Sequence, residues 1–102
     1  MNESVYPKRF NIRWRWDGED GEHITFQHPR SNAINVLNPI GALVFYLSDG
    51  NHSVKDIIEH VMEVYDAPSR EVVANDVYNF VDYMARTGIT MLLEDRVVEP
   101  MA

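Results

Sequence analysis

The stretch LNPIGALVFYLSDG, residues 37–50, marks the point where the periodicity of the sequence changes from that of strands to that of helices. Asn38 is a typical helix N-cap, and Pro39 then occupies the first helical position, where a missing N–H has no cost. The dipeptide Asp49-Gly50 is a typical helix stop. We therefore expect a helix that runs to Ser48, with an apolar face formed by Ile40, Leu43, Val44 and Leu47.

Upstream of this stretch, apolar residues alternate with polar ones, which is typical of half-buried strands. The first alternation covers residues 10–16, with Phe10, Ile12, Trp14 and Trp16 on one face, and we expect the two tryptophans to help form the core. Turn clusters at 17–21 and 29–32 separate it from a second strand at 23–27 and a short third strand at 33–37. Three antiparallel strands in a meander are expected.

Downstream of Gly50, the pattern predicts two further helices. Ser53 opens the second helix, and Asp56 three residues later resembles a capping box. Ser69 caps the third helix, which ends at Gly88. The expected buried stripes are Ile57, Ile58, Val61, Met62 and Tyr65 in the second helix and Val73, Val77, Phe80, Val81 and Met84 in the third.

The end of the chain, residues 89–93 and 96–98, is expected to form a terminal hairpin around Glu94 and Asp95. Strands followed by helices indicate the α+β class. The expected fold is a single domain over residues 1–102, with a three-stranded antiparallel sheet, three helices and a candidate C-terminal β-wing.

Composition and charge exclude several classes of function. The 102 residues include no cysteine, which excludes a disulfide framework and a thiolate metal site and fits a cytoplasmic location. The net charge of −7 is opposite in sign to the footprint of a nucleic-acid-binding protein. Residues 1–10 lack the apolar run of a signal peptide, and the longest apolar stretch, residues 40–47, is too short to span a membrane.

Candidate catalytic and metal-binding patterns are weak. Asp56 and His60 lie four residues apart on one expected helix, but no third ligand is suggested nearby, and a structural zinc site has four. The glycines are scattered and form no phosphate-binding loop. The sequence therefore indicates a protein that is not an enzyme and that binds no metal or cofactor.

Residues 37–50 resemble the most recognisable stretch of the PqqD family. In that family a strand ends in Leu-Asn, a Gly-Ala pair follows inside the first helix, and the helix stops at Asp-Gly. The resemblance covers about residues 13–89, and the further matching pieces are residues 53–58, Tyr65-Asp66, Asp76-Val77, Phe80-Val81 and Gly88-Ile89.

The resemblance implies a three-stranded sheet followed by a winged-helix-like unit of three helices. It also implies a peptide recognition element, which binds the leader segment of a ribosomally made precursor peptide and presents it to a modifying enzyme. That enzyme is often a radical SAM protein, and the founding case serves the biosynthesis of pyrroloquinoline quinone. The implied partners are thus a precursor peptide and a modifying enzyme, without nucleic acid or membrane.

The implied mode of binding is β-augmentation, in which an extended peptide pairs with the edge of a sheet. The third strand is the candidate edge because no proline blocks its pairing. We expect Asn35 to be one of the positions whose N–H points toward the peptide. The candidate peptide-binding residues of this strand are Asn32, Ala33, Ile34, Asn35, Val36 and Leu37.

The third helix is the candidate second wall of the groove. At about 100° per residue, its buried stripe has two flanks. One flank is formed by Ala74, Tyr78, Val81 and Ala85, and the other by Asp76, Tyr83 and Thr87. We favour the first flank because its small residues leave room for a leader side chain. The competing interpretation, that Ala74 and Ala85 only permit close helix packing, stays open.

Two other classes of function remain as alternatives. A winged-helix DNA-binding domain would insert the third helix into the major groove, yet that helix carries Glu71, Asp76 and Asp82 beside Arg70 and Arg86. A small oligomeric subunit would instead pair its exposed strand with that of a second copy.

Overall fold

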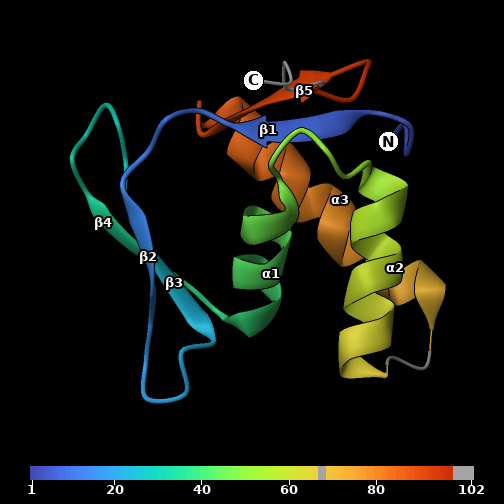
Figure 1. Cartoon of the computed structure of the whole chain (residues 1–102), viewed down its shortest axis with the longest axis horizontal. Coiled ribbons are helices and arrows are strands. Elements are labelled where there is room, and N and C mark those ends of the chain that lie inside the picture. Colours follow the sequence, from blue (N-terminus) through green and yellow to red (C-terminus); the bar gives the residue numbers. More distant parts are fainter. Residues whose placement is uncertain (67–68, 98–102) are drawn as a thin grey trace, which may run out of the picture.

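The computed structural model describes residues 1–66 and 69–97 and confirms the α+β class (Figure 1). A three-stranded antiparallel sheet of order β2-β3-β4 precedes three helices, and β1 and β5 form a second, two-stranded sheet. The elements are β1 (Tyr6–Arg9), β2 (Trp14–Asp17), β3 (His23–Gln27), β4 (Ile34–Leu37), α1 (Pro39–Leu47), α2 (Val54–Tyr65), α3 (Arg70–Arg86) and β5 (Thr90–Leu93).

The helix starts are set by local side-chain caps, as the sequence predicts. The side chain of Asn38 accepts a hydrogen bond from the amide of Gly41 at 2.8 Å. Ser53 and Asp56 form a reciprocal capping box, with N–H···O distances of 3.0 and 3.1 Å. Each cap satisfies a backbone N–H that has no partner within the helix, so the boundary is fixed by residues a few positions apart.

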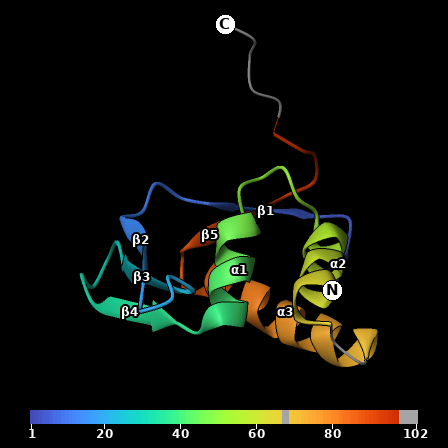
Figure 2. The same cartoon turned by 60° about the horizontal axis from the view of Figure 1, so that its bottom comes forward.

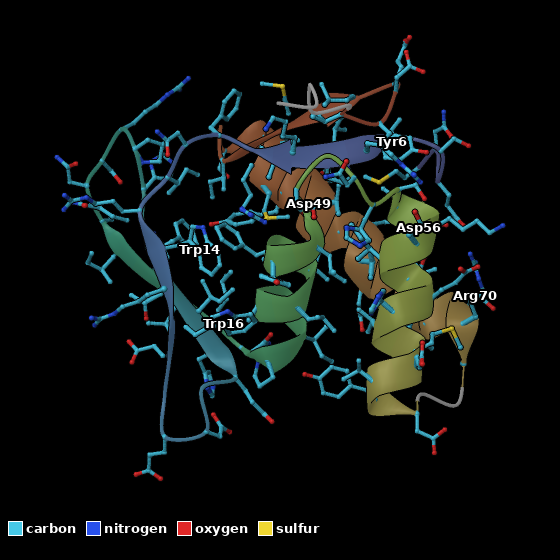
Figure 3. The ribbon with its side chains drawn as sticks, in the orientation of Figure 1. Tyr6, Trp14, Trp16, Asp49, Asp56 and Arg70 are labelled. Atoms are coloured by element: carbon cyan, nitrogen blue, oxygen red, sulfur yellow. The ribbon has the colours of Figure 1, made fainter. Side chains whose placement is uncertain are left out.

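Helix α1 lies between the three-stranded sheet and the other two helices (Figure 1). Phe45 is fully buried there and stacks on Phe26 of β3, with ring centroids 5.4 Å apart. Figure 3 shows Trp14 and Trp16 extending from β2 toward the same helix. Trp14 meets Phe45 edge-on at 5.7 Å, whereas Trp16 stays 42% exposed. Of the two tryptophans expected in the core, Trp14 therefore packs against it and Trp16 lies at its rim.

The buried face of α1 differs from the expected stripe. Ile40 is 38% exposed and Leu43 is half-buried. Because the helix has the sheet on one side and α2 and α3 on the other, it buries a wider arc than a surface helix does. The buried residues of α1 are Gly41, Ala42, Val44, Phe45 and Leu47.

The stripes of α2 and α3 follow the expectation along most of their length. Ile57, Ile58 and Val61 of α2 are buried, while Met62 is half-buried and Tyr65 is 40% exposed. In α3, Phe80 is only partly buried and lies beside the core rather than at its centre. The other four expected residues of that stripe, Val73, Val77, Val81 and Met84, are buried.

The two ends of the chain pair in a way that the sequence did not predict. The first expected strand is interrupted at 10–13, and a separate strand β1 precedes it. β1 runs antiparallel to β5, with Tyr6 opposite Leu93 and Arg9 opposite Thr90. The expected terminal hairpin was wrong, because β5 pairs with β1 and residues 96–97 are not in a strand. Its last residue, 98, lies outside the described residues.

Candidate functional site

Strand β4 forms one edge of the three-stranded sheet, as expected for the third strand. It pairs with β3 on one side, from Gln27 opposite Ile34 to Ile24 opposite Leu37. On the other side no strand of the described chain is paired with it. Ile34 and Val36 are 64% and 66% exposed, although both are β-branched apolar residues. Large exposed apolar side chains on an open edge are the usual mark of an interaction site.

The outward-facing backbone groups of β4 belong to Ile34 and Val36. The amide of Gln27 donates to the carbonyl of Arg13, toward β2, and therefore points away from β4. In an antiparallel ladder the residue opposite such a position also points away from its neighbour, and the pattern repeats every second residue. The expectation that Asn35 points outward is therefore wrong, because Asn35 is opposite Phe26 and faces β3.

A groove of about 420 Å³ runs beside this open edge. The groove is lined by residues from the first turns of α1, from the end of β4 and from α3. The ribbons of these three elements can be followed in Figure 2. A Cβ atom added to Gly41 would come within 3.3 Å of the Phe80 ring, so the glycine lets α3 approach α1 closely. The lining residues are Val36, Leu37, Asn38, Ile40, Gly41, Val44, Asp76 and Phe80.

The wall of this groove is the flank of α3 that carries Asp76, not the flank that the sequence favoured. Ala74 and Val81 are buried in the core, with 4% and 0% of their surface exposed. The hydroxyl of Tyr78 donates to the carboxylate of Glu3 in the N-terminal segment. Within this favoured flank only Ala85 and Tyr78 retain partial exposure, and none of its members lines the groove.

The β3–β4 turn contacts the C-terminal end of α3, beyond the residues that line the groove. His28 Nδ1 accepts from the amide of Arg30 at 3.1 Å, so its Nε2 carries the proton and donates to the carbonyl of Thr87 at 3.0 Å. Asn32 has φ of 60°, and Ala33 accepts from the amide of His28 at 2.8 Å. Asn32 and Ala33 therefore shape the turn, while the edge available for pairing begins at Ile34.

The described residues contain no group of three or more histidine, aspartate or glutamate side chains that could bind a metal ion. His52 lies 3.0 Å from Asp49, and its ring meets that of His60 edge-on at 6.0 Å. Asp56, considered with His60 as a ligand pair, is used in the capping box, and the amide of Ser53 lowers the pKa of its carboxyl.

Within residues 1–66 and 69–97, no helix is both long enough and apolar enough to cross a bilayer.

Comparison with known families gives a match over more than half of the chain. The family described as coenzyme PQQ synthesis protein D (PqqD) matches residues 24–89. The chain belongs to the PqqD family. The matched residues include β4 and all three helices, so the PqqD region contains the whole groove, whereas β1, β2 and β5 lie outside it. No curated protein and no solved structure gave a significant match.

Membership of the PqqD family supports an accessory, peptide-binding role in biosynthesis, with a peptide and a biosynthetic enzyme as partners. It is consistent with a chain that is not itself an enzyme. Sequence reasoning identified the edge strand but missed Phe80 as a groove residue. Asp76, Phe80, Tyr83 and Thr87 follow i, i+4, i+7, i+11 spacing, which places an acidic, two aromatic and a polar residue on one stripe and could have indicated a surface for binding.

Proposed function

We propose that this PqqD-family protein binds the leader segment of a ribosomally synthesised precursor peptide as an additional strand along β4. It then presents the peptide to a modifying enzyme, such as a radical SAM protein of pyrroloquinoline quinone or another modified-peptide pathway. The observation that carries this proposal is the open edge of β4, whose outward backbone groups at Ile34 and Val36 lie beside the groove against α3.

Affinity and selectivity would come from different parts of the peptide. The leader backbone would exchange hydrogen bonds with Ile34 and Val36, which act on any sequence. Alternate leader side chains would point into the groove, because successive side chains of a strand face opposite sides. There they would contact the partly exposed rings of Phe80 and Tyr83, whose centroids are 6.4 Å apart. An apolar leader residue fits this surface.

The proposed role needs no catalytic group. Binding an extended, flexible leader to a fixed edge reduces the entropy that the modifying enzyme must otherwise overcome to order its substrate. A cytoplasmic location, expected from the absence of cysteine, belongs to the same proposal, as does the independence from nucleic acid and membrane.

Proline substitution at the edge tests this mode of binding. Val36→Pro removes an outward N–H from β4 and leaves the ladder to β3 in place. Val36→Ala is the matched control, because it removes the same side chain and keeps the N–H. The ligand is a peptide selected on the unaltered protein from a displayed random library, and its affinity is measured by calorimetry. We expect Val36→Pro to weaken binding about five- to hundredfold and Val36→Ala only slightly, since one lost hydrogen bond between uncharged groups, with its desolvation, costs about 1–3 kcal/mol.

Nuclear magnetic resonance locates the peptide on the protein independently of the variants. Amide shifts should gather on β4 and on the stripe of α3 that includes Asp76 and Phe80. Shifts confined to β2, α2 or the β1–β5 sheet would contradict the proposal, as would equal affinities of the proline and alanine variants.

The DNA-binding alternative has less support. Both arginines of α3 already contact carboxylates, Arg70 that of Glu3 and Arg86 that of Asp82 at 2.8 Å. The stripe of α3 that lines the groove begins with Asp76, whose negative charge opposes contact with phosphates. A duplex-DNA affinity that falls steeply with salt would restore this alternative.

A further inference from the structure

The surface between β4 and α3, here called the β4–α3 face, has a charged side chain toward each end: Asp76 lines the groove, and Arg30 lies beside Gly88, just past the end of α3. Neither side chain has an ionic partner among the described residues. The ion pairs of residues 1–66 and 69–97 involve Arg15, His23, His52, Arg70 and Arg86 with nearby carboxylates, and they include neither Asp76 nor Arg30. Both side chains are exposed. Their charges are therefore available to a bound peptide.

The two charges have opposite signs and lie at opposite ends of the same surface. Asp76 lines the groove where β4 passes into α1, next to Asn38. Arg30 lies in the β3–β4 turn, and its guanidinium is 3.8 Å from the point where a Cβ on Gly88 would stand. His28 fixes this end by its 3.0 Å contact with the carbonyl of Thr87. The stretch of α3 between the two charges presents the rings of Phe80 and Tyr83.

The separation of the charges sets a length for the peptide segment between them. From Asp76 to Gly88 the helix rises about 18 Å, at ~1.5 Å per residue. An extended peptide covers that length in about five or six residues, at ~3.3 Å each. A leader segment of this length also matches the short edge of β4.

The direction of the peptide follows from the direction of β4, which runs from the Arg30 end of the β4–α3 face to the Asp76 end. Antiparallel pairing is slightly more stable per residue than parallel pairing. An antiparallel peptide would therefore enter at Asp76 with its N-terminal end and leave at Arg30 with its C-terminal end.

We propose that the face between β4 and α3, negative at one end and positive at the other, selects leader segments that carry the opposite charge at each end. The preferred segment has a lysine or arginine on its N-terminal side, an apolar centre that contacts Phe80, and an aspartate or glutamate about five or six residues after the basic one. This inference rests on the proposed function and specifies its substrate class. The charges choose the direction and register, while the backbone of β4 supplies most of the affinity.

The expected size of the effect is modest because both charges are exposed. Reversing either charge should change the affinity for a matched peptide about two- to fivefold at low salt. The effect should shrink as ionic strength rises, since the Debye length falls to about 8 Å at 0.15 M. A peptide with uncharged flanks should show no such salt dependence.

The test is a selection from a displayed library of random peptides with alternating apolar residues at their centre. The targets are the unaltered protein, the double variant Asp76→Lys with Arg30→Glu, and the control Glu71→Lys. Glu71 is exposed on α3 about 140° around the helix from Asp76, at ~100° per residue, so it changes the same charge away from the groove. The selected peptides are then located on each protein by amide shifts.

Three outcomes decide the inference. Basic-to-acidic order in the peptides of the unaltered protein and of Glu71→Lys, with the reverse order for the double variant, supports it. In the second outcome, the selected peptides bind along β4 but show no preferred order of charges, or show the same order for the unaltered protein and the double variant. Either result overturns the role of the two charges and leaves the proposed function intact. Peptides that bind away from β4 overturn both.

Discussion

Strands β1 and β4 lie in different sheets and differ in what covers their edges. β1 pairs with β5 on one side, and its other side is used by the loop between α1 and α2. There the amide of Arg9 donates to the carbonyl of Ser48 at 2.8 Å, and the carbonyl of Pro7 accepts from Gly50 at 2.8 Å. Among the strands that the structure describes, β4 pairs only with β3.

Side chains strengthen the same contrast. The guanidinium of Arg9 donates to the carbonyls of Phe45 and Tyr46 at 2.6 Å each and lies over the Trp14 ring at 5.2 Å. β1 is thereby attached to the end of α1, whereas Ile34 and Val36 of β4 project mainly into solvent. The difference teaches that an edge strand is available to a partner only where the chain leaves its outward amides unused. Four sets of variants test this contrast, in order of decreasing effect.

The largest effect is expected from removing a side chain that supports both regions. Phe45 of α1 is fully buried against Phe26 of β3, and the guanidinium of Arg9 of β1 lies over its ring at 5.3 Å. Phe45→Ala should lower the free energy of unfolding by about 3–5 kcal/mol. Phe80→Ala should cost less, because that ring is partly exposed at the groove, yet it should weaken peptide binding. Urea denaturation of both variants measures this, and equal losses would mean that Phe80 belongs to the core.

Proline substitution separates the closed edge from the open one. Lys8 is opposite Met91, in the same alternation as the bond from the amide of Phe10 to the carbonyl of Ile89, so its N–H points to β5. Lys8→Pro should therefore lower the free energy of unfolding by about 1–3 kcal/mol. Val36→Pro should lower it by less than ~1 kcal/mol, because an edge position without a ladder bond tolerates proline. Equal destabilisation would show that Val36 is paired.

A smaller effect is expected at the start of α2, where this helix meets the segment that leads into β1. Ser53 caps this helix, and the next amide, of Val54, donates to the carbonyl of Val5 at 2.9 Å. Ser53→Ala should lower the free energy of unfolding by about 1 kcal/mol, and Ser53→Asp should restore much of it. Peptide binding at β4 should be unchanged in both, which calorimetry checks. A loss of binding in Ser53→Ala would mean that the two regions are coupled.

The smallest effect concerns the N-terminal contact with α3. Hydrogen bonds from Arg70 and Tyr78 hold the pKa of Glu3 below its usual value. A carboxyl whose pKa is lower in the folded protein stabilises it above the unfolded pKa, about 4.3, and loses that contribution as the pH falls through the folded value. Glu3→Gln should therefore be less stable at neutral pH and equal to the unaltered protein in acid. Thermal melts across this range test it, and a constant difference would contradict it.

The parts of this fold that the sequence predicted correctly are local. Asn38, Ser53 and Ser69 were identified as caps, because a cap is a contact between residues three positions apart. The alternation at 23–27 and 33–37 gave β3 and β4 in the same way, since each strand carries its own period. The turn between them placed β4 beside β3, so the meander and its edge strand could be expected.

The candidate site was predicted in part for the same reason. Ile34 and Val36 were among the expected residues, but the outward position was assigned to Asn35 because the strand alone does not give its register against β3. The helical wheel likewise gave the two flanks of α3 without the direction of the sheet. Only the packing of α1 against α3 at Gly41 and Phe80 turns the Asp76 flank toward β4.

By itself, the sequence determined the α+β class, the helix caps and the strand beside the first helix, because each depends on neighbours a few residues away. The tertiary structure decided that β1 pairs with β5, that Arg9 attaches β1 to α1, and that Asp76 and Arg30 lie toward opposite ends of the face between β4 and α3. These pairs are far apart in the chain, and their contact depends on the packing of all the elements between them.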